Sequence, residues 1–385
     1  NYNTVVGDEA GTAITTGDQN TAVGFEALKT ATTAGNNTAL GFKSLRLNTT
    51  GNANVAVGVI ALGANTTAVD NTAVGYNSLG ANTTGDRNTA LGRNALASNV
   101  DGDRGVAVGY DALSSQDPSS NADMYNVGVG YAAGAAVTTG TNNTLIGGLA
   151  GDAITTASNN TAVGKDALGA NTTGGSNVAL GSASLASNTT ASENTAVGYA
   201  SLNANTTGAQ NTATGFYSLA VNTTGVSNTA NGYKALQANT TGASNVALGR
   251  DALYSNTTGS SNTAVGILAG ASVTTGVQNT LIGGLAGDAL TDADFNVAIG
   301  YAALSLDTLG SRSIAIGHSA LDAQNFTSAT DAYNVAIGHA AGTDVTTAVK
   351  STFIGGLAGT NITSGERNTA LGYAALFQDT QGKYT

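Results

Sequence analysis

Apolar and polar residues recur along this chain with a period of seventeen. We number each repeat from its opening Asn, which is position zero, as in the repeat that begins at Asn71. Position one is β-branched in all 22 repeats, position three is Val, Leu or Ile in 20, and the residue between them is Ala in 17. Large residues that alternate with a small one are typical of a short strand with one buried face.

Glycine occupies position four of every repeat and predicts the bend that ends this strand. A Thr-Thr-Gly near positions twelve to fourteen predicts a second bend. As structural corners we single out Gly75, Gly164, Gly300 and Gly372. Seventeen residues with two bends are too few for a βαβ crossover and fit one turn of a parallel β-solenoid. The sequence therefore predicts an all-β fold, a single continuous solenoid domain over residues 1–385, about 100 Å long at about 4.8 Å per turn.

Two exchanges between positions indicate which side chains pack together. Position eight is Leu in 15 repeats and Gly in seven, and in those seven repeats position eleven changes from mostly Asn to Val, Ile or Leu. Since protein interiors keep their packing density, positions eight and eleven are expected to point into one interior, which positions one and three also fill. In a second exchange, Gly replaces the usual Tyr or Phe at position five where a large residue replaces Ala at position two. These pairs are Gly148 with Leu145, Gly284 with Leu281, and Gly356 with Phe353.

Positions two and five are therefore expected to form a second packed surface, which predicts self-association. A face of Ala flanked by exposed aromatic residues such as Tyr76, Tyr199, Phe216 and Tyr301 has no use in a single thin coil unless something packs on it. About three apolar side chains per turn, at roughly 1.5–3 kcal/mol each, also fall short of a backbone entropy cost of about 1–2 kcal/mol per residue. We expect a parallel homotrimer, intertwined or side by side. The alternative is a monomer with scattered exposed tyrosines.

Composition and charge argue against several classes of function. Charged residues make up 10% of the chain, the net charge is −11, and no repeat has a basic stripe, so nucleic-acid binding is not expected. No run approaches the roughly 20 apolar residues of a membrane span, no signal peptide is recognisable, and there is no cysteine. We find no Ser-His-Asp arrangement, metal triad or phosphate loop, so we expect neither an enzyme nor a cofactor. The chain is expected to be a mature or excised piece of a longer fibre.

The pentapeptide that opens each repeat carries a resemblance to a known family. Asn-Val-Ala-Ile-Gly at 296–300 and 334–338, Ser-Ile-Ala-Ile-Gly at 313–317 and the Asn-Thr-Ala-Val-Gly variants resemble the head repeats of trimeric autotransporter adhesins. Similar repeats occur in bacteriophage tail fibres. The resemblance covers essentially the whole chain and implies a left-handed parallel β-roll that assembles as a trimer. The chain departs from the adhesins in its longer repeat and in the lack of a stalk or membrane barrel. Phage fibre and bacterial adhesin both stay open.

The period is broken twice, by four extra residues within 111–126 and within 319–334. Insertions of this kind are expected to protrude and to contact a ligand. The candidate residues are Gln116, Asp117 and Asp123 in the first insertion and Gln324, Asn325 and Phe326 in the second. The alternative is that both insertions are bulges with no binding role.

Two further pairs of residues depart from the pattern on neighbouring turns. His318 and His339 occupy position five, so copies in a trimer would bring six imidazoles together as a weak candidate metal site. A packing role is the alternative, because these histidines merely replace aromatic residues. Thr214 and Asn231 interrupt the apolar rule at position three and are expected to hold water or an ion in the core, or to mark a soft spot.

The function that fits these features is structural. We expect the shaft or head of an extracellular trimeric fibre used for adhesion or host attachment, with copies of itself and a cell-surface glycan or protein receptor as partners. One alternative is a self-assembling extracellular filament subunit, which electron microscopy would distinguish by its long polymers. A less favoured alternative is an ice-binding solenoid, suggested by the repeated Thr-Thr pairs. Those pairs adjoin a bend instead of alternating outward along a strand.

Overall fold

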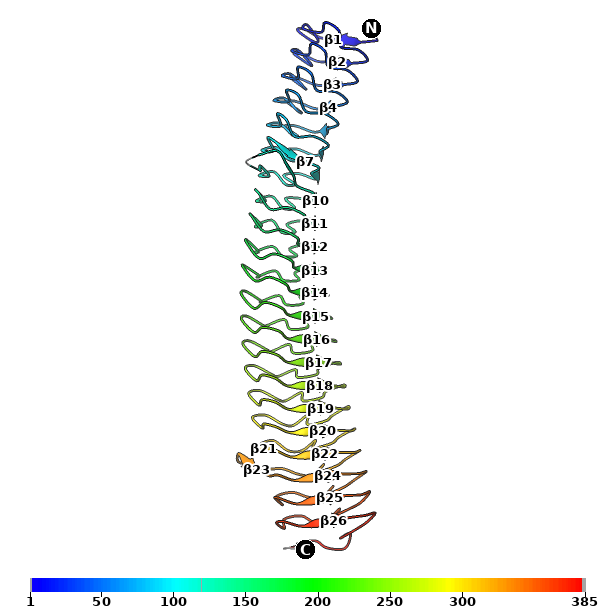
Figure 1. Cartoon of the computed structure of the whole chain (residues 1–385), viewed down its shortest axis with the longest axis vertical. Helices are drawn as coiled ribbons and strands as arrows, with labels where there is room; N and C mark the ends of the chain where they lie inside the picture. The colour runs from blue at the N-terminus through cyan, green and yellow to red at the C-terminus, as the bar shows by residue number, and fades with distance from the viewer. Residues whose placement is uncertain (1, 119, 383–385) are drawn as a thin grey trace. The chain divides into compact units, whose positions relative to one another are not determined.

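The computed structural model describes residues 2–118 and 120–382. The fold is an all-β parallel solenoid of about 22 turns, and the described residues contain no helix (Figure 1). The chain divides into two units, Asn1–Glu193 and Asn194–Thr385, each of which contributes eleven main strands of three residues. The predicted fold class is confirmed. The hand of the coil, the trimer and the single continuous domain stay predictions.

In unit 1, each main strand follows its predecessor by one repeat, and a short pair, β7 and β9, accompanies the first insertion. The main strands are β1 (Thr4–Val6), β2 (Thr21–Val23), β3 (Thr38–Leu40), β4 (Val55–Val57), β5 (Thr72–Val74), β6 (Thr89–Leu91), β8 (Val106–Val108), β10 (Val127–Val129), β11 (Thr144–Ile146), β12 (Thr161–Val163) and β13 (Val178–Leu180). The short pair is β7 (Gly102–Asp103) and β9 (Ala122–Asp123).

Unit 2 repeats this arrangement. Its main strands are β14 (Thr195–Val197), β15 (Thr212–Thr214), β16 (Thr229–Asn231), β17 (Val246–Leu248), β18 (Thr263–Val265), β19 (Thr280–Ile282), β20 (Val297–Ile299), β22 (Ile314–Ile316), β24 (Val335–Ile337), β25 (Thr352–Ile354) and β26 (Thr369–Leu371). Its short pair is β21 (Gly310–Ser311) and β23 (Thr330–Asp331), which lies on the edge of the coil opposite β22 and β24 (Figure 1).

Successive main strands within a unit pair in parallel, each position opposite the same position of the next turn. Thr72 of β5 is opposite Thr89 of β6, and Ala298 of β20 is opposite Ala315 of β22. The register crosses both insertions unchanged, because β8 pairs with β10 and β22 pairs with β24 in the same way. The insertions therefore leave the strand ladder intact.

The faces of the strand are opposite to the prediction. Ala73 at position two is fully buried, whereas the side chain of Val74 at position three is exposed by 37% and Thr72 at position one is half-buried. The expectation that positions one and three fill the interior is wrong. An alternating pattern has the same period on both faces, and here the narrow coil accepts the small residue and turns the large ones outward.

The interior is built from positions two, eight and eleven. Leu79 and Leu96 at position eight are fully buried, as is Ile154 at position eleven of a repeat with Gly at position eight. A Cβ at Gly151 would lie 2.8 Å from Cδ1 of Ile154. This confirms that positions eight and eleven share one interior.

The large residues at position two also fill space left by glycine at position eight. A Cβ at Gly134 would lie 2.6 Å from Cδ1 of Leu145, and one at Gly151 would lie 2.8 Å from its Cδ2. Leu145 therefore compensates for the missing Leu on two successive turns, and the side chain of Leu281 lies in the same way between Gly270 and Gly287. The predicted second surface shared by positions two and five is wrong, because position two is internal and position five is external.

Two buried columns of asparagine satisfy the backbone at the bends. The backbone NH of Asn54 donates to Oδ1 of Asn37 on the preceding turn (2.9 Å), and Nδ2 of Asn54 donates to the carbonyl of Ala68 (2.8 Å). At position eleven, Nδ2 of Asn65 donates to Oδ1 of Asn48 (2.8 Å) and to the same carbonyl of Ala68 (3.3 Å). These amides occupy fully buried positions and supply hydrogen bonds where the backbone leaves the strand ladder.

Position four requires glycine for two independent reasons. Gly75 has φ of 133°, a conformation that L-residues rarely adopt, and a Cβ there would lie 2.5 Å from the carbonyl oxygen of Gly92. Gly164 and Gly300 share both properties, with the corresponding contact at 2.6 and 2.5 Å, whereas Gly372 has φ of 116° and nothing within 4 Å. The backbone bends at all four of these glycines. Further bends at positions six, eight and sixteen use non-glycine residues, such as Leu79 with φ of 49°.

Candidate self-association face and surface sites

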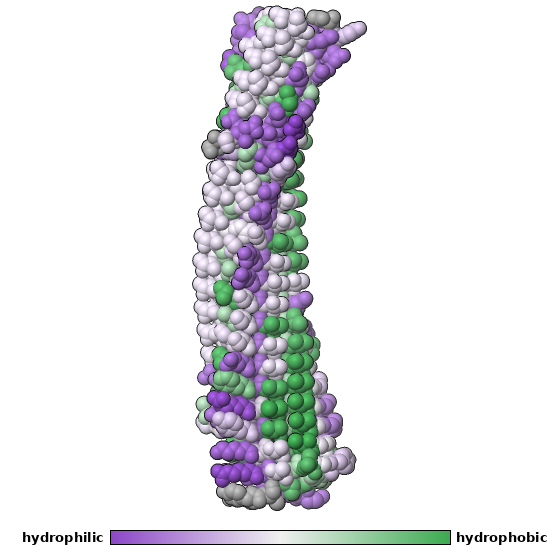
Figure 2. Space-filling view, in the orientation of Figure 1, coloured by the Kyte–Doolittle hydropathy of each residue, from purple (hydrophilic) through white to green (hydrophobic). Residues whose placement is uncertain are grey.

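The outward face of the main strands is free of charge. Positions one and three contain only Thr, Val, Ile, Leu and Asn in all 22 repeats. Their apolar side chains are substantially exposed, by 45% at Leu40, 38% at Ile146 and 37% at Leu248. Figure 2 shows these residues as a column of hydrophobic side chains along the strands of unit 2. We call the side chains of positions one and three the outward face.

Two polar residues interrupt the column at position three. Thr214 of β15 is half-buried and Asn231 of β16 is exposed, and the two lie opposite each other in the strand ladder. They do not face the core, so the expectation that they hold water or an ion there is wrong. Within the described part of the chain, the amide of Asn231 makes no hydrogen bond through its side chain.

Aromatic rings at position five form stacks along one edge of the outward face. Tyr199, Phe216 and Tyr233 stack with ring centroids 5.5 and 5.6 Å apart. Phe25 stacks on Phe42 at 5.4 Å. Because the rings cover each other's faces, mainly their edges are presented to solvent. The stacks therefore line the outward face without offering broad flat platforms.

The two histidines belong to such a stack. The rings of His318 and His339 are 5.3 Å apart at 15°, and His318 also stacks on Tyr301 at 5.5 Å. The described residues contain no group of three or more His, Cys, Asp or Glu side chains arranged to hold a metal. The structure brings the histidines together in the aromatic column, and a metal site built from several copies stays a prediction.

The first insertion is held against the coil by its own contacts. β7 and β9 pair in parallel, with Asp103 opposite Asp123. Asp123 forms an ion pair with Arg104 and accepts a hydrogen bond from the hydroxyl of Tyr125 (3.2 Å). The guanidinium of Arg104 lies 5.6 Å from the centre of the Tyr125 ring.

The second insertion repeats the strand pairing, the Arg–Asp ion pair and the contact of the guanidinium with a tyrosine ring. β21 and β23 pair in parallel, and Nε of Arg312 lies 2.9 Å from Oδ1 of Asp331. The guanidinium of Arg312 lies 5.9 Å from the ring centre of Tyr333 and 4.6 Å from that of Phe295. These contacts therefore hold the described part of each insertion against the coil.

Three of the six predicted binding-loop residues point inward, so this part of the prediction is wrong. Gln116 and Gln324 are fully buried, and Phe326 is exposed by only 6%. Asp117, Asp123 and Asn325 are exposed, and a ligand contact through them stays a prediction.

The buried glutamines complete the amide columns where the pattern fails. Position zero is Gly105 in the first interrupted repeat and Ser313 in the second, instead of Asn. Oε1 of Gln116 accepts a hydrogen bond from Nδ2 of Asn126 (3.0 Å), and Oε1 of Gln324 accepts one from Nδ2 of Asn334 (2.9 Å). The longer side chain thus bridges the columns at positions eleven and zero. The joint loss of Asn and gain of Gln was a readable signal for this role.

Asp307 is a buried acid that sequence reasoning missed. It takes the place of Asn at position eleven, beneath the second insertion, and is fully buried. Its carboxylate accepts hydrogen bonds from Nε2 of Gln324 (2.6 Å) and from the backbone NH groups of Gly310 (3.0 Å) and Phe326 (3.1 Å). Burial raises the pKa of Asp307 above its ordinary value of 3.8, against the opposing effect of these hydrogen bonds.

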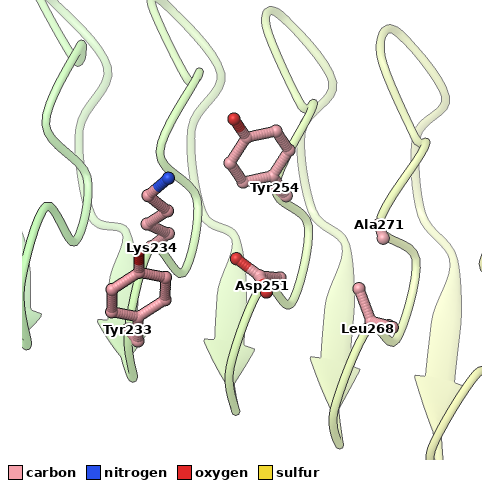
Figure 3. Close-up of a pocket in the computed structure, with 6 residues that line it drawn as sticks. All are labelled: Tyr233, Lys234, Asp251, Tyr254, Leu268 and Ala271. Atoms are coloured by element: carbon pink, nitrogen blue, oxygen red, sulfur yellow. The ribbon is translucent and has the colours of Figure 1, made fainter.

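A surface groove of about 320 Å³ lies on the corner beyond position five in unit 2. It is lined by Tyr233, Lys234, Asp251, Tyr254, Leu268 and Ala271. Figure 3 shows these side chains on three successive turns, with Tyr233 and Lys234 on the first, Asp251 and Tyr254 on the second, and Leu268 and Ala271 on the third. The ammonium of Lys234 lies 5.3 Å from the ring centre of Tyr233 and 5.9 Å from that of Tyr254.

The residues of the groove combine stacking and hydrogen bonding. Position nine is small or polar in most repeats, so Tyr254 is unusual there, and Ala271 follows it at the same position of the next turn. One face of the Tyr254 ring is therefore not covered by another ring. An exposed ring face beside a carboxylate and an ammonium suits a small polar ligand with an apolar side.

No protein-family model and no curated protein sequence matches this chain. None of the described residues forms a helix long and apolar enough to span a membrane.

Proposed function

We propose that the protein is the shaft or head of an extracellular trimeric fibre that serves attachment, as in a phage tail fibre or a bacterial surface adhesin. The observation that supports this best is the outward face. Every described turn presents an uncharged strand surface to the outside, most of it apolar. A largely apolar surface of this kind is typical of an interaction site in a soluble protein.

A second copy of the chain is the partner that fits this face best. The face repeats at the spacing of hydrogen-bonded strands, about 4.8 Å, and only a partner with the same repeat can match it turn after turn. Three strand residues per turn cover roughly 50 Å², so eleven turns offer roughly 500 Å² in each unit. The face of each unit alone thus offers more than half of the roughly 800 Å² per partner of a standard stable interface.

Light scattering combined with size exclusion tests this proposal. We expect a mass three times the 37.5 kDa of the chain. Ile282→Asp places a charge on the outward face and should shift the protein to monomers, since an unpaired charge is costly in an apolar interface. The exposed corner substitution Thr258→Asp is the matched control and should leave the mass unchanged. A monomeric unsubstituted protein would refute the proposal.

The groove around Tyr254 is the place where we propose that the fibre contacts a receptor glycan. The apolar side of a sugar ring would lie on the uncovered face of Tyr254, with hydroxyl groups donating to Asp251 and accepting from Lys234. A glycan array should show binding that Tyr254→Ala reduces at least tenfold. Tyr76→Ala removes an exposed tyrosine elsewhere and should not change binding. An equal loss in both variants would argue against the groove.

Ice binding is a second candidate because of one observation. Threonine occupies position one of 14 repeats, where it lies on the outward side of the strand ladder. An ice-binding surface needs threonines that point outward from a strand. The Thr-Thr pairs at the bends do not have this arrangement, whereas the threonines at position one do. A thermal hysteresis assay tests this function, and a normal freezing point for the purified protein would exclude it.

A further inference from the structure

We infer that Thr214 and Asn231 set the axial register between copies of the chain on the outward face. This inference rests on the proposed self-association. The two residues lie on neighbouring turns of unit 2 and project on the same side as the apolar column. They are the only polar residues among the 22 at position three.

A uniform solenoid has no intrinsic register with its own copies. Each turn presents a similar outward face, so a shift of one copy by one turn, about 4.8 Å, exchanges similar contacts for similar contacts. Position one is Thr in 14 repeats, Val in seven and Ile in one, and all three residues are β-branched and similar in shape. At position three, Val, Leu and Ile replace one another at small cost. Only a residue of different chemistry can distinguish one shift from another.

The polar pair supplies that difference. With parallel copies in register, Asn231 of one copy meets Asn231 of the others, and amide donors and acceptors can pair. After a shift of one turn, the amide of Asn231 would instead face Leu248 or Thr214, and after larger shifts it would face apolar residues alone. A polar group buried without a partner disfavours that arrangement. Single buried asparagines fix the register of coiled coils for the same reason.

The other irregular features are poorly placed for this role. The second insertion lies on the edge of the coil opposite the strands of unit 2 (Figure 1). The aromatic stacks at position five border the outward face and present ring edges. Thr214 and Asn231 are the residues that interrupt the face itself.

Disulfide mapping tests the register directly, because the natural chain has no cysteine. A disulfide needs Cβ atoms about 3.5–4.5 Å apart, so it reports a shift of one turn. Copies with Leu248→Cys are refolded together with copies that carry Val265→Cys or Ile282→Cys. The mixture is then oxidised, and mass spectrometry identifies the peptides that have become linked. We expect one dominant offset, in which identical residues are linked. In a Thr214→Val/Asn231→Val background, we expect links at two or more offsets, while Thr212→Val, the position-one control in the same strand, should keep one.

Moving the polar pair gives a second, independent test. A moved-pair variant combines Thr214→Val and Asn231→Val with Val265→Thr and Ile282→Asn, three turns further along the chain. When this variant is mixed with a chain that keeps Thr214 and Asn231, the polar residues of the two chains should align. Leu248→Cys on the chain that keeps the pair should then be linked to Ile299→Cys on the moved-pair chain.

The possible outcomes separate this inference from the proposed function. A monomer in light scattering overturns both. An oligomer that keeps one offset without the polar pair overturns the register role alone. The register role is also overturned if identical residues remain linked when the moved-pair variant is mixed with the natural chain. Circular dichroism of each variant confirms that the solenoid is folded before the links are read.

Discussion

The two interrupted repeats solve one structural problem with different interior residues. Both pin the insertion by an Arg–Asp ion pair next to a tyrosine and both use a buried Gln to bridge the amide columns. The first fills the space beneath the insertion with Pro118 and Met124, and the second with Phe326 and Ala332 at the equivalent positions. Backbone pairing is thus shared, and the buried volume is redistributed between two positions.

A second difference between the breaks is electrostatic. The residue below the first Gln is Asn99, whose Oδ1 accepts a hydrogen bond from Nε2 of Gln116 (3.4 Å). The equivalent residue in the second break is Asp307, which accepts a shorter bond from Gln324 (2.6 Å). A backbone NH group can donate a hydrogen bond either to the amide oxygen of an Asn or to the carboxylate oxygen of an Asp. The same geometry therefore accommodates the buried acid Asp307 in the second break. The raised pKa of Asp307 is therefore expected to give the second break a pH dependence of its own.

The largest expected effect concerns a feature that both interrupted repeats share. This is the ladder of main strands, which continues across each insertion. A Cβ at Gly109 would lie 2.3 Å from the carbonyl oxygen of Gly130, and one at Gly317 would lie 2.3 Å from that of Gly338. Gly109→Ala and Gly317→Ala should therefore each cost about 2–6 kcal/mol, from backbone strain and overpacking together. Hydrogen exchange of the neighbouring strands measures the loss. Gly148→Ala is the control, with nothing within 4 Å, and a similar loss there would contradict this explanation.

The buried residues beneath the two insertions should be interchangeable only as pairs. Phe326→Ala should lower the free energy of local opening by about 3–5 kcal/mol, because it leaves a cavity beneath the second insertion. Replacing both residues with the first break's pair, Phe326→Pro with Ala332→Met, should recover all but about 1.5 kcal/mol. Hydrogen exchange at β21 and β23 checks both variants. Failure of the double replacement to recover protection would show that the breaks are not equivalent.

Acid should affect the two breaks differently. The folded-state pKa of Asp307 is raised by burial, so its contribution to stability is greatest below the unfolded value and falls as pH rises through the folded value. Asp307→Asn should remove this part of the pH dependence, and Asn99→Asp should introduce it into the first break. Opening free energies from hydrogen exchange, measured at acid and neutral pH, test the sign. If Asp307 stabilised the second break more at neutral pH than at acid pH, the folded-state pKa would be lowered instead of raised.

The smallest expected effect concerns the surface pins. Arg104→Ala and Arg312→Ala should each cost about 0.2–1 kcal/mol, because both ion pairs are partly exposed to solvent. The loss should be confined to β7 with β9 or to β21 with β23. Added salt should reduce the difference between variant and natural protein. A loss of protection that extends into the main strands would show that the pins support the whole turn.

The repeat contained one further signal about the fold. Where position two is Leu145, Leu281 or Phe353, position eight is Gly in both the same repeat and the preceding one. This correlation places position two inside, opposite position eight. The simultaneous change at position five is not a packing exchange, because position five is external. The exchange between positions eight and eleven is easier to interpret, because both members change within one turn.

The candidate sites were less accessible to sequence reasoning. The insertions were found by the broken period, but the inward direction of Gln116, Gln324 and Phe326 depends on amide columns that run between turns. The groove around Tyr254 combines residues seventeen positions apart. Such a site is visible only when the turns are stacked in register.

The sequence by itself determined the period, the parallel solenoid and the glycine corners. A fixed repeat forces each turn onto an identical one, and position four tolerates no side chain next to the backbone of the following turn. Only the tertiary structure decided which side of the strand faces inward. A period of two fits either face equally, and the choice depends on how much side-chain volume the narrow coil encloses. It is this choice that leaves the larger residues outside, on the surface where we propose that copies of the chain meet.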